Sequence, residues 1–438
     1  MAVRLDDARN DVEIDLEQSP FAPRDAKAMF VWAALIAGVA VGGRIINESL
    51  ATNVLAPPLF GRFDLRFGPA TVLAAAVGGI VVWWGPRVAA TFSWRVLPVV
   101  TVAAAAVWAL SLALVDGVDA LTAPLKGPHD YLASVGRIDA PEIFLQTFTA
   151  QLETFSLHVQ GHPPGMVLIL WSLAALGLGG AGWAAALVIA TGASTSAALL
   201  LVVKSMTGES KARNLAPFLV LSPAAIWIAT SADAFFMGVG AWGIALVALG
   251  AERRSDLMAF AGGIALGLLL FLSYGAVALA PVALVVMWVH RALRQLVVAL
   301  GGVLAVTLLF VAAGFWWFDG LSESVARYEA GVSSQRPFAW FAVANLGAFA
   351  LVLGPAAAVG LARLRRAPAA ALIWAALAGV LAANLSGLSK GEIERIWLIF
   401  VPWILVACTT IDLRRARGML ALQGLAALAI QTGVRTPW

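Results

Sequence analysis

The sequence predicts an all-α, polytopic transmembrane protein, and two observations support that fold class. Of the 438 residues, 61% are hydrophobic and only 12% are charged, and the mean hydropathy is +0.88, too apolar for a soluble globular protein of this length. Apolar runs recur between residues 28 and 432, and many approach the roughly 20 residues that a helix needs to cross a bilayer. The runs show no alternation of the kind found in β-barrels, so the spans are expected to be helices. From the number of runs we expect about twelve to thirteen spans.

The first 27 residues differ from the rest, because they hold seven acidic and four basic side chains and almost no apolar periodicity. They predict a disordered cytosolic tail, followed by one transmembrane domain over residues 28–438. The segment has no basic start followed by an apolar core and a small-residue cleavage site. The first apolar run is therefore expected to stay in the protein as an anchor.

The charged loops predict the orientation of the spans. The positive-inside rule places the loops richest in Arg and Lys in the cytoplasm. These loops are residues 204–213, 252–256, 290–294, 362–366 and 412–417. The net charge of +4 comes mostly from such loops, so no nucleic-acid partner is expected. The only cysteine, Cys408, cannot form an internal disulfide.

The first half of the chain fits this orientation with one exception. Spans near residues 28–46, 70–85 and 96–115 place residues 116–165 outside. The next apolar run, 166–178, has only thirteen residues, and counting it as a crossing would put the cations that follow residue 203 on the wrong side. We therefore expect a juxtamembrane helix at the outer surface. The preceding His-Pro-Pro-Gly turn suits a rigid helix start, because proline tolerates the first turn.

The external loop 116–165 is predicted to hold the chemistry, because it is the longest polar stretch after the tail. It contains three of the four histidines and several acids: Asp116, Asp119, Asp130, Asp139, Glu142 and Glu153. Loops hold functional residues more often than cores do. The alternative for any single one of these charges is a solvated loop surface.

Four stretches resemble the GT-C membrane glycosyltransferases, in particular the branch of protein O-mannosyltransferases and lipid A aminoarabinose transferases. They are "HDYL" (129–132), "GHPPG" (161–165), "LSPAAIWIATSADA" (221–234) and "IERIWLIFVPWIL" (393–405). The resemblance extends loosely over residues 97–411. Two departures are that His129 precedes Asp130 where the family has a second acid after it, and that two additional spans precede the usual first one.

The resemblance implies an enzyme of cell-envelope biosynthesis, a hexosyl- or pentosyltransferase that moves a sugar from a polyprenyl-phosphate donor to a lipid, glycan or protein acceptor. Its site would face the non-cytosolic side of the plasma membrane, in contact with membrane lipids. Asp130 is the matched acid and would take the proton of the acceptor hydroxyl. Asp233 is the second catalytic carboxylate, and the alternative is that it caps the next helix. His129 and Tyr131 flank Asp130 and are expected to contact substrate.

The turn 386–395 is the predicted phosphate site, because Lys390 and Arg395 are usual phosphate partners. Glu392 and Glu394 either pair with these cations or contact the sugar, and the alternative is an interfacial salt-bridge cluster. Three residues of the preceding external stretch are expected to close over the donor or to steer anionic lipid headgroups, and the alternative is a solvated loop. They are Arg327, Tyr328 and Arg336.

His158 and His162 stand four apart, but the prolines after His162 disfavour a helix through it, so the pair is not a strong metal motif. Both histidines are expected at the substrate-binding site, where His162 positions the other groups. No cofactor is assigned, and dependence on a divalent metal is left open. A secondary transporter or lipid-linked-sugar flippase, and a non-catalytic assembly protein of the envelope, are the alternative functions. The position of the charges at outer helix ends favours an enzyme over a transporter.

Overall fold

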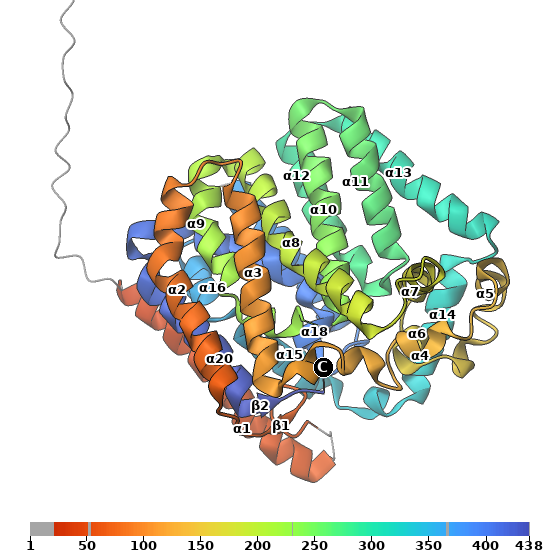
Figure 1. The fold of residues 1–438 in the computed structure, drawn as a ribbon, viewed down its shortest axis with the longest axis horizontal. Coiled ribbons are helices and arrows are strands. Elements are labelled where there is room, and N and C mark those ends of the chain that lie inside the picture. The colour runs from red at the N-terminus through yellow and green to blue at the C-terminus, as the bar shows by residue number, and fades with distance from the viewer. Residues whose placement is uncertain (1–21, 51–53, 230, 365–367, 438) are drawn as a thin grey trace, which may run out of the picture.

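The fold is a polytopic helical bundle (Figure 1), which confirms the predicted all-α class. The computed structural model describes residues 22–50, 54–229, 231–364 and 368–437. Its α-helices are α1 (Pro23–Leu50), α2 (Pro69–Thr91), α3 (Leu97–Ala113), α4 (Leu132–Val135), α5 (Pro141–Thr147), α6 (Leu157–Gln160), α7 (Gly165–Ala175), α8 (Ala181–Thr207), α9 (Glu209–Val220), α10 (Ala232–Arg253), α11 (Asp256–Leu270), α12 (Ala280–Val289), α13 (Leu293–Ala312), α14 (Trp317–Ala330), α15 (Phe338–Leu353), α16 (Pro355–Ala362), α17 (Pro368–Leu385), α18 (Ile393–Ile396), α19 (Val401–Leu405) and α20 (Ala416–Gly433).

Short 3₁₀ helices connect these elements. They are η1 (Leu114–Asp116), η2 (Val118–Leu121), η3 (Pro124–Lys126), η4 (Leu152–Thr154), η5 (Pro223–Trp227), η6 (Tyr274–Leu279), η7 (Val332–Gln335), η8 (Leu398–Phe400), η9 (Val406–Thr410) and η10 (Leu413–Arg415). Two short strands, β1 (Arg62–Phe63) and β2 (Val434–Arg435), pair antiparallel and tie the end of the chain to the segment after α1.

Within the described residues, seven helical segments are long and apolar enough to cross a membrane, or eight if the bent pair α15–α16 counts as one span. The predicted count of about twelve to thirteen is higher, because shorter apolar helices also give hydropathic runs. Four such helices measure 10–17 residues: α7, α11, α17 and the η6–α12 unit. Helix α7 has eleven residues, in agreement with a short helix that starts after the Pro-Pro pair.

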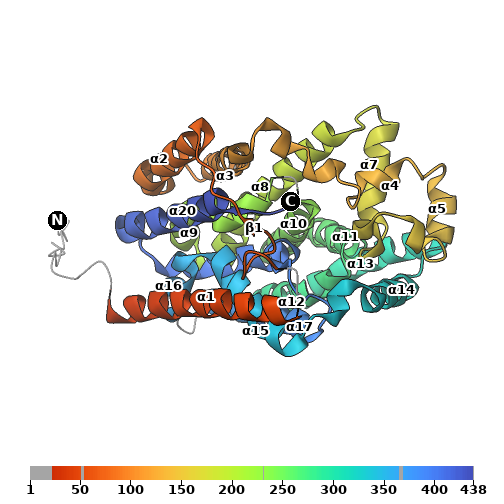
Figure 2. The ribbon, with the colours of Figure 1, turned by 90° about the horizontal axis from the view of Figure 1, so that it is seen from below.

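The predicted tail lies mostly outside the described residues, which begin at residue 22. Helix α1 starts at Pro23, so the last residues assigned to the tail are helical. Asp25, in the first turn of α1, is fully buried and pairs with Arg363 just after α16. This ion pair fixes the start of α1 against the end of α16, and Figure 2 shows α1 running along one side of the bundle near α16 and α15.

Glycines allow the central helices to approach closely. A Cβ at Gly238 of α10 would lie 2.4 Å from the carbonyl oxygen of Thr191 in α8, and one at Gly263 of α11 would lie 2.0 Å from that of Ala299 in α13. Small residues at such crossings bring backbones together in membranes, where packing replaces the hydrophobic driving force. Helix α10 therefore forms the buried centre, flanked by α8 and α11.

The bent span α15–α16 turns by 100° at Gly354, which has a φ of 79°. The side chain of Gln423 on α20 is fully buried beside this break. Its amide nitrogen donates to the Leu353 carbonyl at 2.7 Å, and its amide oxygen accepts from the Ala356 N–H at 3.0 Å. The Gln423 side chain therefore satisfies backbone groups on both sides of the break, so these groups are not left open to a ligand.

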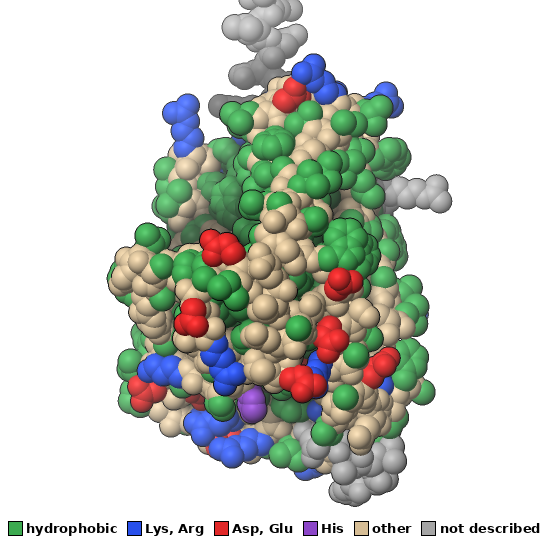
Figure 3. Space-filling model, turned by 90° about the vertical axis from the view of Figure 1, so that its right-hand side faces the viewer, with side chains coloured by type: hydrophobic (Ala, Val, Ile, Leu, Met, Phe, Trp, Pro, Cys, Tyr) green, Lys and Arg blue, Asp and Glu red, His purple; other side chains and the backbone are tan. Residues whose placement is uncertain are grey.

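Polar residues gather at two ends of the bundle. The first, here called the arginine end, comprises residues 204–213, 252–256 and 290–294 at the ends of helices. Its segments are in contact, because the Ser205 hydroxyl lies 3.0 Å from His290 Nε2 and the Arg254 guanidinium donates to the His290 carbonyl at 3.0 Å. The second, here called the site end, comprises residues 116–165 and 386–395. Figure 3 shows charged side chains over the lower half of one face and again at its top edge.

Candidate functional site

Four segments that are distant in sequence meet around His158 at the site end. The His158 Nδ1 atom lies 3.1 Å from Asp130 Oδ2, and its Nε2 atom lies 3.3 Å from an Arg395 Nη atom. The other Nη atom of Arg395 donates to Asp233 Oδ2 at 2.9 Å. These contacts join the turn before α4, helix α6, helix α18 and the first turn of α10. Asp130, Asp233 and Arg395 are each less than 10% exposed.

Local hydrogen bonds hold Asp130 and His158 in register. Asp130 Oδ1 accepts the Tyr131 N–H at 2.7 Å, and the His158 N–H donates to the carbonyl of His129 at 2.9 Å. Both Asp130 oxygens therefore have partners. The imidazole of His129 is exposed and makes no hydrogen bond or ion pair with the described residues, so only its backbone contributes to the site.

The contacts of His158 define its protonation. Arginine has only donors, so the ring nitrogen facing Arg395 must present a lone pair. A carboxylate has only acceptors, so the nitrogen facing Asp130 must hold the proton. These two contacts fit the His158 tautomer that has the proton on Nδ1 and the lone pair on Nε2. This arrangement, a carboxylate orienting an imidazole, is the one that activates a general base.

Asp233 does not cap helix α10; Ser231 does. The Ser231 hydroxyl accepts the Asp233 N–H at 3.2 Å and donates to Asp233 Oδ2 at 3.0 Å. The carboxylate therefore sits in the first turn of α10, where the helix dipole favours negative charge. Its ion pair with Arg395 supplies the partner that a carboxylate at the end of an apolar helix needs.

The backbone that presents Arg395 is strained. Gly391 has a φ of 96° and Glu392 has a φ of 62°, a conformation that costs a non-glycine residue free energy. Glu392 Oε2 lies 2.9 Å from an Arg395 Nη atom, so this ion pair stabilises the turn. Arg395 thus contacts two carboxylates and one imidazole. Strain of this kind is concentrated at functional sites.

An aromatic wall covers one side of the cluster. The Tyr131 ring lies 5.8 Å from the rings of both His158 and His162, and the His162 ring lies 5.7 Å from that of Phe236. His162 Nδ1 lies 2.8 Å from the carbonyl of His158, so it donates this hydrogen bond. Burial lowers the pKa of His162 to about 4, although Asp233 opposes the shift. Burial likewise raises the pKa of Tyr131.

Lys390 and Arg336 form a second polar group beside the first. The Lys390 ammonium donates to the Ser334 carbonyl at 2.6 Å, and the Arg336 guanidinium donates to the Lys390 carbonyl. Lys390 has no ion pair with a carboxylate among the described residues. Burial lowers the pKa of Arg336, and the nearby carboxylates of Glu392 and Glu394 oppose that shift. Glu392 therefore lies between the two groups.

Residues of α14 hold the surrounding loops together. Tyr328 donates its hydroxyl to the Gly387 carbonyl at 3.0 Å, which ties α14 to the turn 386–395. Burial raises the pKa of Tyr328. Arg327 pairs with Glu153 of the 116–165 segment and, at 3.8 Å, with Glu323. Its charge is therefore already neutralised by acids.

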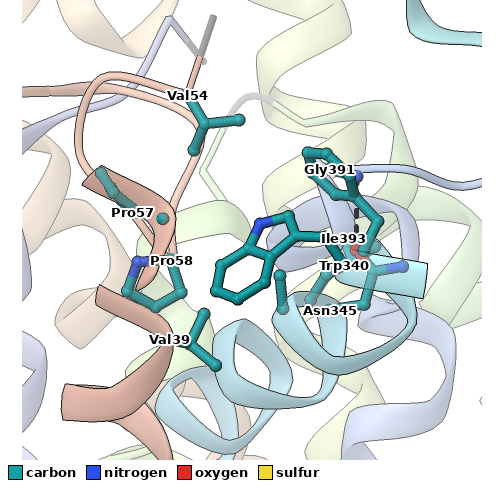
Figure 4. A pocket seen from close by; sticks show the side chains of 11 residues that line it. Val39, Val54, Pro57, Pro58, Trp340, Asn345, Gly391 and Ile393 are labelled. Carbon is teal, nitrogen blue, oxygen red and sulfur yellow. Dashed lines mark hydrogen bonds between the residues drawn. The ribbon is translucent and has the colours of Figure 1, made fainter. Parts of the chain in front are cut away.

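Glu394 points away from the cluster. It is fully buried, and its Oε1 atom accepts the Phe60 N–H at 3.0 Å, whereas its Oε2 atom has no hydrogen-bond partner among the described residues. The preceding residue, Ile393, lines a small pocket together with Trp340, Asn345 and residues of the segment after α1 (Figure 4). Glu394 thus anchors the segment before β1 to α18 and does not face His158.

The structure therefore brings together Asp130, Tyr131, His158, His162, Asp233, Glu392 and Arg395. It places Lys390, Arg336, Tyr328 and Arg327 in the adjoining loops. Sequence reasoning missed Ser231, Phe236 and Ser334; a serine two residues before Asp233 was a visible capping signal. Among the described residues, no group of three or more His, Cys, Asp or Glu side chains could hold a metal ion.

Comparison of the chain with protein-family models, with curated proteins and with solved structures gives no match. A function therefore has to follow from the chemistry of the site itself.

Proposed function

We propose that this protein is an integral membrane glycosyltransferase that moves a sugar from a polyprenyl-phosphate donor to a cell-envelope acceptor at the non-cytosolic face of the plasma membrane. The observation that supports this proposal best is the buried chain from Asp130 through His158 and Arg395 to Asp233. Buried charges in a membrane protein are costly, and they indicate function rather than stability.

In this proposal His158 is the general base. Its Nε2 lone pair faces only a 3.3 Å contact with Arg395, the longest in the cluster, so an acceptor hydroxyl could replace that contact. Asp130 acts as a positioning residue, because both of its oxygens are occupied and it holds the imidazole in the tautomer that accepts a proton. The role of general base, predicted from sequence for Asp130, is thereby assigned to its hydrogen-bond partner His158.

The charge of the cluster suits the reaction at the sugar. Asp130, Asp233 and Glu392 contribute three carboxylates and Arg395 one guanidinium, so these four side chains have a formal net charge of −2. Transfer of a sugar passes through a transition state with positive charge on the ring. Carboxylates held in place by Arg395 stabilise that charge without reorganising.

The donor phosphate is assigned to Lys390. Arg395 is already held by two carboxylates, whereas Lys390 contacts only a backbone carbonyl among the described residues. A lysine ammonium is a compact charge suited to a phosphate oxygen. Arg336, which is tied to the Lys390 backbone, supports the same turn.

The alternative of a secondary transporter receives less support. Transporters use broken helices whose free backbone groups line a binding cavity near the membrane midplane. Here the bent span α15–α16 has its backbone groups at the break satisfied by Gln423. The buried charges instead lie at the ends of helices and in the adjoining loops.

The proposal is tested in a strain that lacks the gene, by mass spectrometry of its polyprenyl-linked sugars. We expect one lipid-linked sugar to accumulate, and wild-type protein to restore its consumption. Asp130→Asn should be expressed normally but lower the rate of consumption by about 10² to 10⁴, the usual contribution of general-base catalysis. The control Asp139→Asn changes an exposed acid of the same loop and should restore consumption fully. Full restoration by Asp130→Asn would contradict the proposal.

A further inference from the structure

An open pocket lies at the arginine end, at the opposite end of helix α10 from Asp233. It has a volume of about 440 Å³ and lies between the α10–α11 and α12–α13 loops. Its lining includes three arginines, Arg254, Arg291 and Arg294, but only one acid, Asp256. The pocket therefore has an excess of two positive charges, which favours an anionic ligand.

The three arginines differ in how they are held. Arg254 donates to the carbonyls of His290 and Arg291 at 3.0 and 3.2 Å, and thereby joins the two loops. Arg294 pairs with Asp256. Arg291 is exposed, and its guanidinium makes no hydrogen bond or ion pair with the described residues, so its five side-chain N–H donors are available.

The backbone on both sides of the pocket adopts a conformation that arginine rarely takes. Arg254 has a φ of 53° and Arg291 a φ of 50°, both in the left-handed region. Glycine usually occupies this position at the end of a helix, because it avoids the steric cost of a side chain there. Arginine at both positions therefore keeps a guanidinium on each wall of the pocket at a conformational cost.

An apolar track begins at the same pocket. Leu293, which lines it, is 74% exposed, and the exposed residues Val297, Leu300, Leu304 and Leu308 follow at spacings of four, three, four and four along α13. Such spacings place them on one face of the helix. A ligand in the pocket could thus place an anionic headgroup against the arginines and an apolar chain along the exposed face of α13.

We propose that this pocket binds the phosphate headgroup of an anionic phospholipid, with an acyl chain along the exposed face of α13. Arginine forms bidentate hydrogen bonds to phosphate, and basic residues at a membrane surface attract anionic lipid. Free phosphate shares the headgroup chemistry but would gain nothing from the apolar track. The inference does not depend on the proposed glycosyltransferase function, because no residue of the two sites is shared.

The test uses the purified full-length protein in detergent, titrated with phosphatidylglycerol or phosphatidylcholine, with bound lipids counted by native mass spectrometry. We expect phosphatidylglycerol to bind in preference to phosphatidylcholine, and Arg291→Gln to weaken its binding about fivefold, the effect of losing one cation at a membrane surface. The matched control is Arg253→Gln, which changes an exposed arginine next to the pocket that does not line it, and it should bind as wild type does.

Inorganic phosphate distinguishes the two sources of the anion. In the proposal, millimolar inorganic phosphate displaces little phosphatidylglycerol, because it lacks the acyl chains. Displacement at equal concentration would identify free phosphate as the ligand and overturn the lipid assignment. Equal binding of phosphatidylglycerol to the Arg291→Gln and Arg253→Gln variants would contradict the assignment of this pocket as the lipid site.

Discussion

Arginine has different surroundings at the two ends of the bundle. At the arginine end, Arg291 is exposed and Arg254 joins two loops through backbone carbonyls. At the site end, Arg395 is 7% exposed and is held by Asp233, Glu392 and His158. Exposed cations in loops are a signal of orientation, whereas a buried cation must be matched by charges that the fold brings to it. Burial therefore distinguishes arginines that must be neutralised by neighbouring carboxylates from arginines that stay open to a ligand from outside the protein.

The largest difference between the two ends is expected in stability. Arg395→Met leaves the buried carboxylate of Asp233, and the partly exposed one of Glu392, without their partner, and we expect a loss of about 3–5 kcal/mol in the free energy of unfolding. The variant Arg294→Met removes an ion pair with Asp256 whose arginine is 78% exposed, and it should change stability little. Thermal unfolding in detergent measures both.

A double variant separates charge from packing in this comparison. Arg395→Met combined with Asp233→Asn removes one of the uncompensated carboxylates, so it should lose less stability than Arg395→Met alone. Equal losses for Arg395→Met and Arg294→Met would show that burial does not distinguish the two ends.

The attachment of the site loop to the bundle is expected to show the next largest effect. A Cβ at Gly165, where α7 begins, would lie 2.3 Å from the carbonyl oxygen of Phe271. We therefore expect Gly165→Ala to cost about 1–3 kcal/mol through forced backbone shifts. At Gly161, in the same turn, the nearest atom would be 3.8 Å away, so Gly161→Ala is the control. Equal thermal stability of the two variants would show that this contact does not fix the turn.

The pH dependence of stability should also differ between the ends. The pKa of His162 is lowered to about 4 in the folded protein, against about 6.5 when unfolded, so protonation favours unfolding. The stabilisation by neutral His162 is complete above pH 6.5 and is lost as the pH falls toward 4. Burial lowers the pKa of His290 as well, so it should act in the same direction but less.

Unfolding temperatures measured between pH 4 and 8 test this prediction. His162→Gln should flatten the pH dependence more than His290→Gln does. A wild-type profile that does not fall in this range, or that His162→Gln leaves unchanged, would contradict the assigned shift.

Single cysteine substitutions, which should perturb the protein least, test whether the two ends lie on opposite sides of the membrane. Asp139→Cys and Ser386→Cys place exposed thiols at the site end, and Arg253→Cys places one at the arginine end. The native Cys408 is fully buried and should give little background. A membrane-impermeant maleimide added to intact cells should label the first two variants and not the third. Labelling of all three from one side would contradict the orientation inferred from charge.

The helical class and the first spans could be predicted from sequence, because hydropathy reports burial in lipid directly. The spans expected near 70–85 and 96–115 correspond to α2 and α3. The bend at Gly354 could not be predicted, since it depends on Gln423, which is 69 residues later in the chain. The thirteen-residue length of the run 166–178 did predict the short helix α7, whereas hydropathy could not distinguish spans from the shorter apolar helices α11, α12 and α17.

Several residues of the candidate site could be predicted from sequence, but the part that each one plays in the cluster could not. Asp130 was selected through the family resemblance, and Asp233 and Arg395 by residue type and position at helix ends. His158 and Arg395 link the three in one chain of contacts. Glu392 and Glu394 looked equivalent in sequence, yet Glu392, the residue just before α18, pairs with Arg395, whereas Glu394 inside α18 accepts from the Phe60 N–H. The central position of His158 depended on a contact across 237 residues that no local pattern encodes.

The most direct test of the central claim is sugar transfer by the purified protein, with a synthetic polyprenyl-phosphate sugar as donor and His158→Gln as the variant. The control is His129→Gln, because the His129 side chain is exposed and only its carbonyl contacts His158. We predict that His158→Gln lowers transfer by about 10² to 10⁴ at unchanged unfolding temperature, while His129→Gln transfers sugar as the wild type does. Undiminished transfer by His158→Gln, or no transfer by the wild-type protein, would contradict the assignment of the buried cluster as a glycosyltransferase site.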